Sequence, residues 1–520
     1  MKIIKLLLIF IVAALVLSFS NPVLAAETNK YGSSSQDIDT DYYEEDVSTV
    51  LPESYSSVDK GYVTSVKNQG NSDICWAYAS TSTFESLLLS YGLFFDDLSA
   101  AHMDKWATPK SDNTGWLRQE GEGGLTYIPC GYYTSWNGPA AEDDSLISQG
   151  VTSIIYLDKS DKDLIKKTIM KSGAVTANLG IVNKAYSKDK CSYCLNRESS
   201  SIQGHTLSVV GWDDNYSKYK FDGRYSPENN GAWLCKNSWG ENNSIGGYLW
   251  VSYEDYYIFD NNTFSPSFGI KSFVDRDENY HLYQNEHYGA TYEFIYAEKY
   301  SKDITYLNVF DFSENGNVLD KVVFETISAG AKYTLYYIPL KENIPTTDKK
   351  RWRKLGEGTV DYMGYICADV ESVLPQSKGA IAVELNTEGT EAINSVGVDE
   401  WLIDTDNTML FTDVCTGGNG YVIYNDTIED IKDFYKNNLD DDIGGNLVIK
   451  AITDEKYDIL YGDTNLDGEV SIVDATLIQK KLAKMLSFNI YQDADADFDC
   501  DGKVNISDVT AIQKYLAKIV

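Results

Sequence analysis

Residues 68–80 read NQGNSDICWAYAS, and in this stretch a single thiol, Cys75, follows a Gln-containing loop. From Cys75 onward apolar side chains recur at helical spacing, which predicts a largely buried helix over residues 75–91. A thiol attacks a carbonyl carbon only as thiolate, and the partial positive charge of a helix N-terminus favours that form. Attack also builds negative charge on the carbonyl oxygen, for which the Gln69 amide and the Cys75 N–H are candidate donors. The stretch therefore favours a nucleophilic cysteine at the start of a buried helix.

A nucleophilic thiol needs a base, and the sequence holds only four histidines. His205 heads the apolar segment GHTLSVVGWDD, where its ring can point into a cleft while the following residues pack as a strand. Farther along, the segment KNSWG contains Asn237, whose side-chain oxygen can accept from an imidazole N–H and orient the ring. Trp239 can shield that hydrogen bond from water. The other three histidines lie shortly after the predicted helix or in a β-rich region, where they suit this role less well.

Taken singly, each of these residues is more often an ordinary core residue than a functional one. Their combination, in the segments 51–80, 204–214 and 236–255, resembles papain-like cysteine peptidases. The segment DLSAAHMDKW at 97–106 adds to the likeness, and the resemblance spans residues 51–265. It implies an α+β domain with a cleft between a helical half and a β-rich half. It also implies the site roles: Cys75 as nucleophile, His205 as acid and base, Asn237 orienting His205, and Gln69 in the oxyanion hole.

The chain departs from the usual family pattern around the nucleophile. Ser72 stands where relatives usually carry a cysteine that is bridged elsewhere, and Asp73 and Ile74 replace small residues. The long inhibitory propeptide of many relatives is also missing. No catalytic atom is lost, so we expect activity without the usual zymogen control.

Two other functional classes remain open. A binding component of a complex with an inactive peptidase-like domain would share these segments, although an inactive relative often loses one of the four site residues. A transglutaminase-like acyl transferase would usually require an Asp downstream of the histidine, and Asn237 argues against it.

Near the C-terminus, two Asp- and Asn-rich loops precede the similar segments DATLIQKKLAK and DVTAIQKYLAK, which begin at Asp474 and Asp508. A calcium loop presents oxygens from alternate residues, with a glycine at the sharp bend. Gly468 and Gly502 set the register, and the backbone carbonyls of Glu469 and Lys503 take the seventh position. The pattern predicts two calcium ions held by Asp463, Asn465, Asp467, Glu469, Ser471 and Asp474, and by Asp497, Asp499, Asp501, Lys503, Asn505 and Asp508.

Both loops close with Asp where an EF-hand has Glu, and only the helices that follow the loops are evident. This pattern, over residues 459–520, resembles a dockerin module, a small α-helical calcium-binding domain. The resemblance implies a cohesin module on a scaffolding protein as partner, as in cellulosome-type complexes. The residue pairs 472–473 and 506–507 correspond to the partner-reading sites of that family.

Between these two parts, residues 272–454 form short alternating apolar runs separated by turns, which predicts an all-β sandwich. The segments AIAVELNT and NLVIKAIT resemble the lectin-like domain found after papain-like domains in secreted clostridial proteins. Carbohydrate is then a candidate ligand, and a spacer role is equally open. The chain as a whole is therefore expected to be multidomain.

The N-terminus and the composition bear on localisation. Residues 1–26 read as a secretory signal peptide, and residues 27–50 as a polar, acidic, disordered leader. The signal peptide and the dockerin resemblance together predict a secreted protein on a bacterial cell-surface complex, and no later segment is expected to span a membrane. The net charge of −34 argues against nucleic acid as a partner. The eight cysteines are scattered, and Cys191 and Cys194 form a lone C-x-x-C pair.

Overall fold

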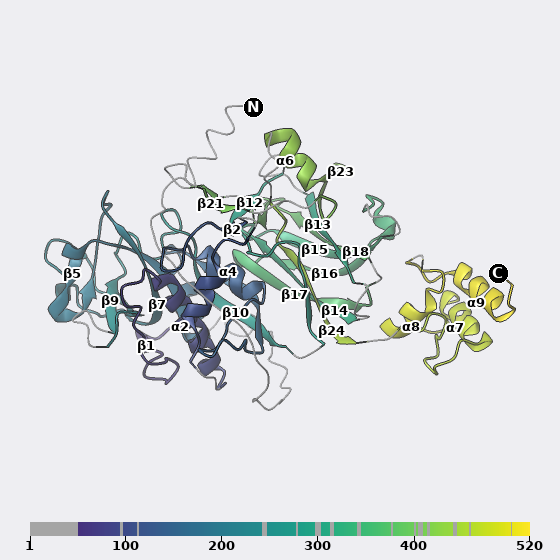
Figure 1. Cartoon of the computed structure of the whole chain (residues 1–520), viewed down its shortest axis with the longest axis horizontal. Coiled ribbons are helices and arrows are strands. Elements are labelled where there is room, and N and C mark those ends of the chain that lie inside the picture. Colours follow the sequence, from purple (N-terminus) through teal and green to yellow (C-terminus); the bar gives the residue numbers. More distant parts are fainter. Residues whose placement is uncertain are drawn as a thin grey trace.

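The computed structural model describes residues 50–519 except 94–96, 112–113, 242–246, 277–278, 297–302, 313–316, 341–344, 376–377, 400–401, 404–408, 413–416, 440–444, 457–458 and 501. The predicted signal peptide and nearly all of the predicted leader lie outside the described residues. In Figure 1 the N-terminal part (purple to teal) lies beside a central body of strands (green), and a small helical unit (yellow) ends the chain. The chain is therefore multidomain, as expected, with a part of helices and strands, an extensive β part and helices near the C-terminus.

Three helices form one half of the peptidase part. The longest, α2, is almost entirely buried from Cys75 to Leu88, because it carries small and apolar side chains on every face. It ends near Gly92, whose φ of +72° suits a residue without a Cβ. The elements of this half are α2 (Cys75–Ser90), α3 (Ala100–Trp106), α4 (Tyr127–Thr134) and the short strand β2 (Gly115–Trp116).

The other half is a mostly antiparallel sheet with one covering helix, in which β6 and β9 pair in parallel. In β7, His205 lies opposite Leu179 of β4, and Ser208 lies opposite Lys236 of β8. Asp161 caps α5 by accepting a hydrogen bond from the Leu164 N–H. The elements are β1 (Ser54–Ser56), β3 (Gln149–Leu157), α5 (Lys162–Ser172), β4 (Val175–Ile181), β5 (Tyr186–Ser187), β6 (Ser192–Tyr193), β7 (Gln203–Asp213), β8 (Ala232–Lys236) and β9 (Tyr248–Ser252), with 3₁₀ turns at Asn183–Ala185, Lys188–Lys190 and Lys218–Lys220.

One sheet continues from the peptidase part into the middle of the chain. Strand β10 (Ser267–Asp275) pairs with β3 along its length, and β17 (Gly364–Val373) pairs with β3 through Gly364 and Tyr365. In the described residues this makes a 13-stranded sheet with the order β11-β24-β14-β17-β3-β10-β4-β7-β8-β9-β6-β5, to which β1 adds at β7. The two parts therefore share backbone hydrogen bonds as well as side-chain contacts.

A second, six-stranded sheet with the order β16-β15-β18-β13-β22-β23 faces the β14, β17 and β24 end of the first. Phe324, Leu335, Val383 and Ile449 are fully buried in the hydrophobic core, so the middle part is the expected sandwich. Its remaining elements are β11 (His281–Tyr283), β12 (Tyr292–Phe294), β13 (Asp303–Asp311), β14 (Asn317–Thr326), β15 (Lys332–Pro339), a 3₁₀ turn (Lys349–Arg351), β16 (Arg353–Thr359), β18 (Lys378–Asn386), β19 (Val396–Val398), β20 (Leu402–Ile403), β21 (Met409–Thr412), β22 (Gly420–Tyr424), β23 (Thr427–Asp430), α6 (Ile431–Leu439) and β24 (Ile449–Lys456).

The C-terminal unit consists of α7 (Ile472–Leu482), α8 (Ile490–Ala496) and α9 (Ile506–Leu516) around a small core (Figure 1). The core residues are Ala475, Ile478, Ala496, Val509 and Ile512. Helix α8 precedes the second loop and was missed from the sequence, because its seven residues IYQDADA are acidic and too few to show a helical period.

No helix in the described part of the chain is long and apolar enough to cross a membrane. None of the cysteines in that part, Cys191 and Cys194 included, forms a disulfide.

Candidate active site and calcium loops

The folded chain brings the predicted catalytic residues together at one cavity. Gln69, Cys75 and His205 line a cavity of about 130 Å³, and Trp239 closes one side of it. Cys75 is the first residue of α2, where backbone N–H groups have no partner within the helix. His205 lies near the start of β7, and Asn237 directly follows β8, the next strand of the sheet.

Asn237 holds the His205 ring through a hydrogen bond between Nε2 of the imidazole and Oδ1 of the amide, at 3.0 Å. The same Oδ1 accepts the backbone N–H of Ser238 at 2.9 Å, so this atom is the carbonyl oxygen of the amide. The neutral ring therefore carries its proton on Nε2, and Nδ1 keeps a lone pair that can accept a proton. The Trp239 indole stacks on the imidazole, with ring centroids 4.8 Å apart.

Gln69 is tied to the loop after β8 by two hydrogen bonds. Its backbone N–H donates to the Ser238 carbonyl at 2.8 Å, and its side-chain Oε1 accepts from the Ser238 hydroxyl at 2.6 Å. One hydrogen of its Nε2 goes to the Ser72 carbonyl, which leaves the second for a ligand in the cavity. Ser238 was not singled out from the sequence, although it follows Asn237 directly.

Burial shifts the pKa values of the two reactive groups in opposite directions. Desolvation raises the pKa of the Cys75 thiol to about 11, and the nearby charge of Asp73 also raises it. Hydrogen bonds from Thr206 oppose this rise. Desolvation lowers the pKa of His205 to about 4, although the bond to Asn237 opposes that shift. Each group alone is therefore uncharged at neutral pH. Thr206 and Asp73 are site residues that sequence reasoning did not assign.

His102 does not belong to this site. It is buried on α3, where Nδ1 pairs with the Tyr132 hydroxyl at 2.5 Å, and burial lowers the pKa of its ring to about 3.

Comparisons with known proteins agree with this geometry. A family model described as papain family cysteine protease matches residues 51–265. The solved structure of a clostridial cysteine protease, Cwp84 after propeptide cleavage, is 34% identical, with a TM-score of 0.68, over 78% of this chain and 99% of that chain. The chain belongs to the papain family of cysteine proteases.

A second structure of Cwp84 shows that its similarity to this chain extends beyond the protease domain. Described as the cysteine protease and lectin-like domains of a surface layer associated protein of Clostridium difficile, it is 33% identical, with a TM-score of 0.68, over 78% of this chain and 90% of that chain. Among curated relatives, mouse cathepsin R is 28% identical over 216 residues, or 39% of this chain. The chain spans about 60% of the length of that relative.

This papain-family protease ends in two loops with the same hydrogen-bond pattern. In the first, Asp463 Oδ2 accepts the Gly468 N–H at 2.7 Å, and Asp474 accepts from the N–H groups of Asn465 and Ser471. Gly468 has a φ of +87°, as a sharp bend requires. Asp467 accepts the N–H of Glu469, whose backbone carbonyl was the predicted ligand.

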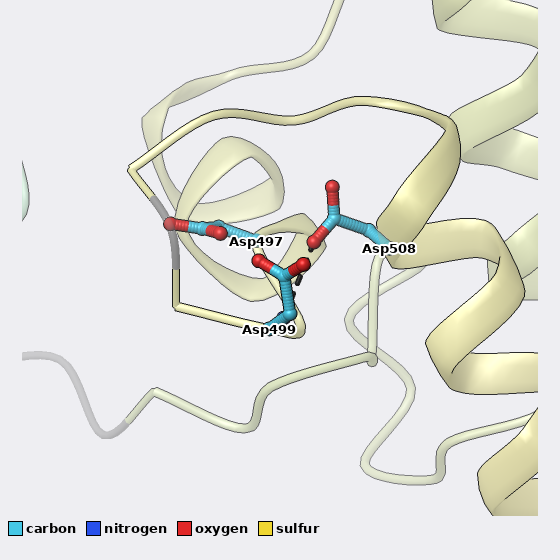
Figure 2. A group of neighbouring side chains, drawn as sticks. All are labelled: Asp497, Asp499 and Asp508. Carbon is cyan, nitrogen blue, oxygen red and sulfur yellow. Dashed lines mark hydrogen bonds between the residues drawn. The ribbon is translucent and has the colours of Figure 1, made fainter. Parts of the chain in front are cut away.

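The second loop repeats these bonds at the equivalent positions. Asp497 accepts the Gly502 N–H at 2.7 Å, and Asp508 accepts from the N–H groups of Asp499 and Asn505. The carboxylates of Asp497, Asp499 and Asp508 face one another with oxygens within 4.8 Å (Figure 2). Of the other predicted ligands, Lys503 accepts a hydrogen bond from Asn505 through its carbonyl, and Asp501 lies outside the described residues.

The donor chemistry of these loops suits calcium. Three carboxylates this close repel one another unless a proton or a cation lies among them, and their hard oxygen donors are those that calcium prefers. A family model described as dockerin type I domain matches residues 461–517. The papain-family protease therefore carries a dockerin, a domain type that binds calcium.

Proposed function

We propose that this chain is a secreted endopeptidase that cleaves peptide bonds through Cys75, His205, Asn237 and Gln69. The observation that carries the proposal is the His205–Asn237 hydrogen bond at a cavity that Cys75 and Gln69 also line. That bond leaves Nδ1 of the imidazole as the proton acceptor.

The first half of the reaction forms an acyl-enzyme. The Cys75 proton moves to His205 Nδ1 as the sulfur attacks the carbonyl carbon of the substrate. The negative charge on the carbonyl oxygen is stabilised by the Cys75 N–H and the remaining Nε2 hydrogen of Gln69. The imidazolium then gives its proton to the leaving amine as the C–N bond breaks.

The second half restores the enzyme. His205, neutral again, takes a proton from water, and the hydroxide attacks the thioester carbonyl. The C–S bond breaks and the proton returns to the sulfur, which releases the acid product. Asn237 accepts from the same Nε2–H throughout, so the ring keeps one orientation while Nδ1 gains and loses its proton.

An epoxysuccinyl-type thiol probe tests this function on the full chain. We expect wild type to label at one cysteine and to cleave peptides, while Cys75→Ala and His205→Ala do neither. Asn237→Ala should lower kcat by about 100-fold, because the ring loses its orientation. A wild-type chain that neither labels nor cleaves would instead support the alternative, a non-catalytic binding component.

We infer that the dockerin attaches the peptidase to a cohesin module of a cell-surface scaffold. Calcium would be held at two sites, by side-chain oxygens of the two loops and the carbonyls of Glu469 and Lys503. The start of each loop-following helix presents apolar side chains to solvent: Ile472 is 57% exposed, Val473 51% and Ile506 60%. Exposed apolar side chains at the start of both helices favour a protein partner.

Calorimetry with a purified type I cohesin tests the attachment. We expect binding in calcium, none in EDTA, and a loss of at least tenfold in affinity for the double variant Ile472→Asp, Ile506→Asp. Full affinity of that variant would exclude these residues from the interface. Carbohydrate binding by the sandwich domain stays a proposal, to be tested by glycan-array screening of the full chain.

A further inference from the structure

Residues 119–124, here the flanking segment, lie against the residues on both sides of the nucleophile. The Gly121 carbonyl accepts the Asp73 N–H at 3.4 Å, and Asp73 lines the same cavity as Cys75. On the other side, Gly124 packs on the indole of Trp76, where an added Cβ would lie 2.5 Å from the ring. The position of the flanking segment therefore bears directly on the turn that presents Cys75.

One buried guanidinium holds this segment. Arg118 is 9% exposed and donates from Nε to the Gly123 carbonyl at 2.9 Å and from Nη2 to the Gln119 carbonyl at 2.6 Å. A longer bond of 3.4 Å reaches the Glu122 carbonyl. The guanidinium carbon also lies 5.7 Å from the centre of the Trp76 ring. Arg118 thus contacts both the segment and a neighbour of Cys75.

The same side chain is anchored to the body of the domain. Nη2 forms an ion pair with the buried Asp104 of α3 at 2.8 Å, and Nη1 donates to the Ala107 carbonyl at 2.6 Å. Immediately before it, the Leu117 N–H donates to the Leu410 carbonyl at 2.8 Å, next to the strand pair of β2 and β21. The flanking segment thus begins where the sandwich domain contributes a strand to the peptidase domain.

Among the described residues, no disulfide bond holds the flanking segment in addition to these contacts. None of the described cysteines forms a disulfide, and position 72 is a serine. Arginine suits the task because its planar group directs five N–H donors outward in fixed directions, whereas lysine offers one compact ammonium.

We propose that Arg118 is a positioning residue, which holds the flanking segment against Asp73 and Trp76 and so fixes the turn that presents Cys75. The proposal rests on the peptidase function above for its kinetic consequence. Its structural part, the coupling of Arg118 to residues 72–78, is independent of activity.

The test compares Arg118→Lys with Arg276→Lys in the full chain. Arg276 is a matched control: its guanidinium carbon lies 5.2 Å from the centre of the Trp136 ring and it donates to the Ser148 and Ile147 carbonyls, neither of which lines the cavity. Hydrogen exchange is measured in peptides covering 72–78, and kcat and KM are measured with a peptide substrate.

We expect Arg118→Lys to speed exchange at 72–78 and to lower kcat by about 10- to 100-fold, since small misplacements of reacting groups have effects of this size. Arg276→Lys should change neither. Equal exchange at 72–78 in the two variants would overturn the positioning role, and so would an unchanged kcat. Failure of wild type to label or cleave would count against the peptidase function alone, because the exchange comparison stands without it.

A second variant covers the case in which Arg118→Lys does not fold. Gly124→Ala leaves Arg118 in place, but its added Cβ would clash with the Trp76 ring and so push the flanking segment away from that ring. Faster exchange at 72–78 is again expected, and unchanged exchange would overturn the proposal.

Discussion

Cys75 and His205 are buried in the wall of one cavity, and burial alone keeps both uncharged. The thiol has its pKa raised to about 11 and the imidazole has its pKa lowered to about 4. A single charge on either residue would be desolvated and unpaired. Transfer of the thiol proton to the imidazole creates both charges at once, so that each partly offsets the desolvation cost of the other. In the proposed mechanism, the reactive species is therefore the thiolate–imidazolium pair and not either residue alone.

Asp73 provides a test of this electrostatic balance. Its carboxylate raises the pKa of the Cys75 thiol, so Asp73→Asn should lower that pKa. Alkylation should then be faster at pH values below the midpoint of the wild-type pH profile. The measurement is the pH profile of iodoacetamide labelling, with Cys75→Ala used to subtract other thiols. Asp73→Glu keeps the charge and should stay close to wild type. A midpoint that does not move, or moves upward, contradicts the assignment.

Among the elements, α4 depends on one close approach. Gly131 lies so near the backbone of Tyr288 that an added Cβ would be 1.7 Å from its carbonyl oxygen. Ala is normally a better helix former than Gly. Helix propensity therefore predicts that Gly131→Ala stabilises the protein, whereas packing predicts that it destabilises the protein. Packing decides, because the helix lies directly on the first residues of the middle domain.

We expect Gly131→Ala to lower the free energy of unfolding by about 1–3 kcal/mol, as overpacked substitutions do. Thermal or denaturant unfolding of the full chain measures it. Gly223→Ala is the control, because nothing lies within 4 Å of a Cβ there, and it should change stability little. Stabilisation by Gly131→Ala would show that α4 can move away from Tyr288.

The calcium loops make stability depend on pH when calcium is absent. Burial, together with Asp499 and Asp497, raises the pKa of Asp508 above its ordinary value of 3.8. A raised pKa in the fold means that stability is fully present below the unfolded value and is lost as pH rises through the folded one. In EDTA the dockerin should therefore melt at a lower temperature as pH rises above about 4.

Circular dichroism of the dockerin signal in the full chain measures this trend. Calcium should raise the melting temperature and remove the dependence, because it replaces the proton among the carboxylates. Asp508→Asn should also remove the dependence in EDTA. A melting temperature in EDTA that rises with pH, or that calcium leaves unchanged, would refute the site.

At the scale of the whole molecule, a buried ion pair within the sandwich lies where that domain contacts the peptidase. Lys450 of β24 and Glu286 are both fully buried, 2.6 Å apart. Lys450 also donates to the Thr134 carbonyl at the end of α4, at 3.0 Å. Lys450→Met leaves Glu286 as an unpaired buried charge, so we expect a loss of about 3–5 kcal/mol in unfolding free energy.

The double variant Lys450→Met, Glu286→Gln is the control for that change. It removes both charges and should recover most of the loss in a denaturant titration. Equal destabilisation by the single and double variants would show that the charge pair itself is not the cause.

The shared sheet predicts where the chain can be divided. Residues 51–265 omit β10, which lies between β3 and β4 in the sheet, so the fragment should expose its core and remain largely insoluble. Residues 51–456 retain β10, β17 and β24 and should fold. Limited proteolysis and circular dichroism of both fragments check this, and a cooperatively folded 51–265 fragment would contradict it.

The sequence by itself determined the elements that local spacing encodes. The helix of Cys75, the strand of His205, the alternating strands of the middle part and both calcium loops follow from periodicity and from side-chain chemistry within a dozen residues. Side-chain chemistry suggested roles for Gln69 and Asn237, and the resemblance to papain-like peptidases supported the same roles.

The contacts between segments that lie far apart in the sequence were decided only by the tertiary structure. It showed that one sheet joins two domains, that Arg118 lies against Trp76 beside Cys75, and that Lys450 pairs with Glu286 where the sandwich meets α4. No local pattern marks these residues, because an arginine or lysine on its own reads as a solvated surface charge. Burial, and the partners that compensate it, arise only when separate parts of the chain pack together.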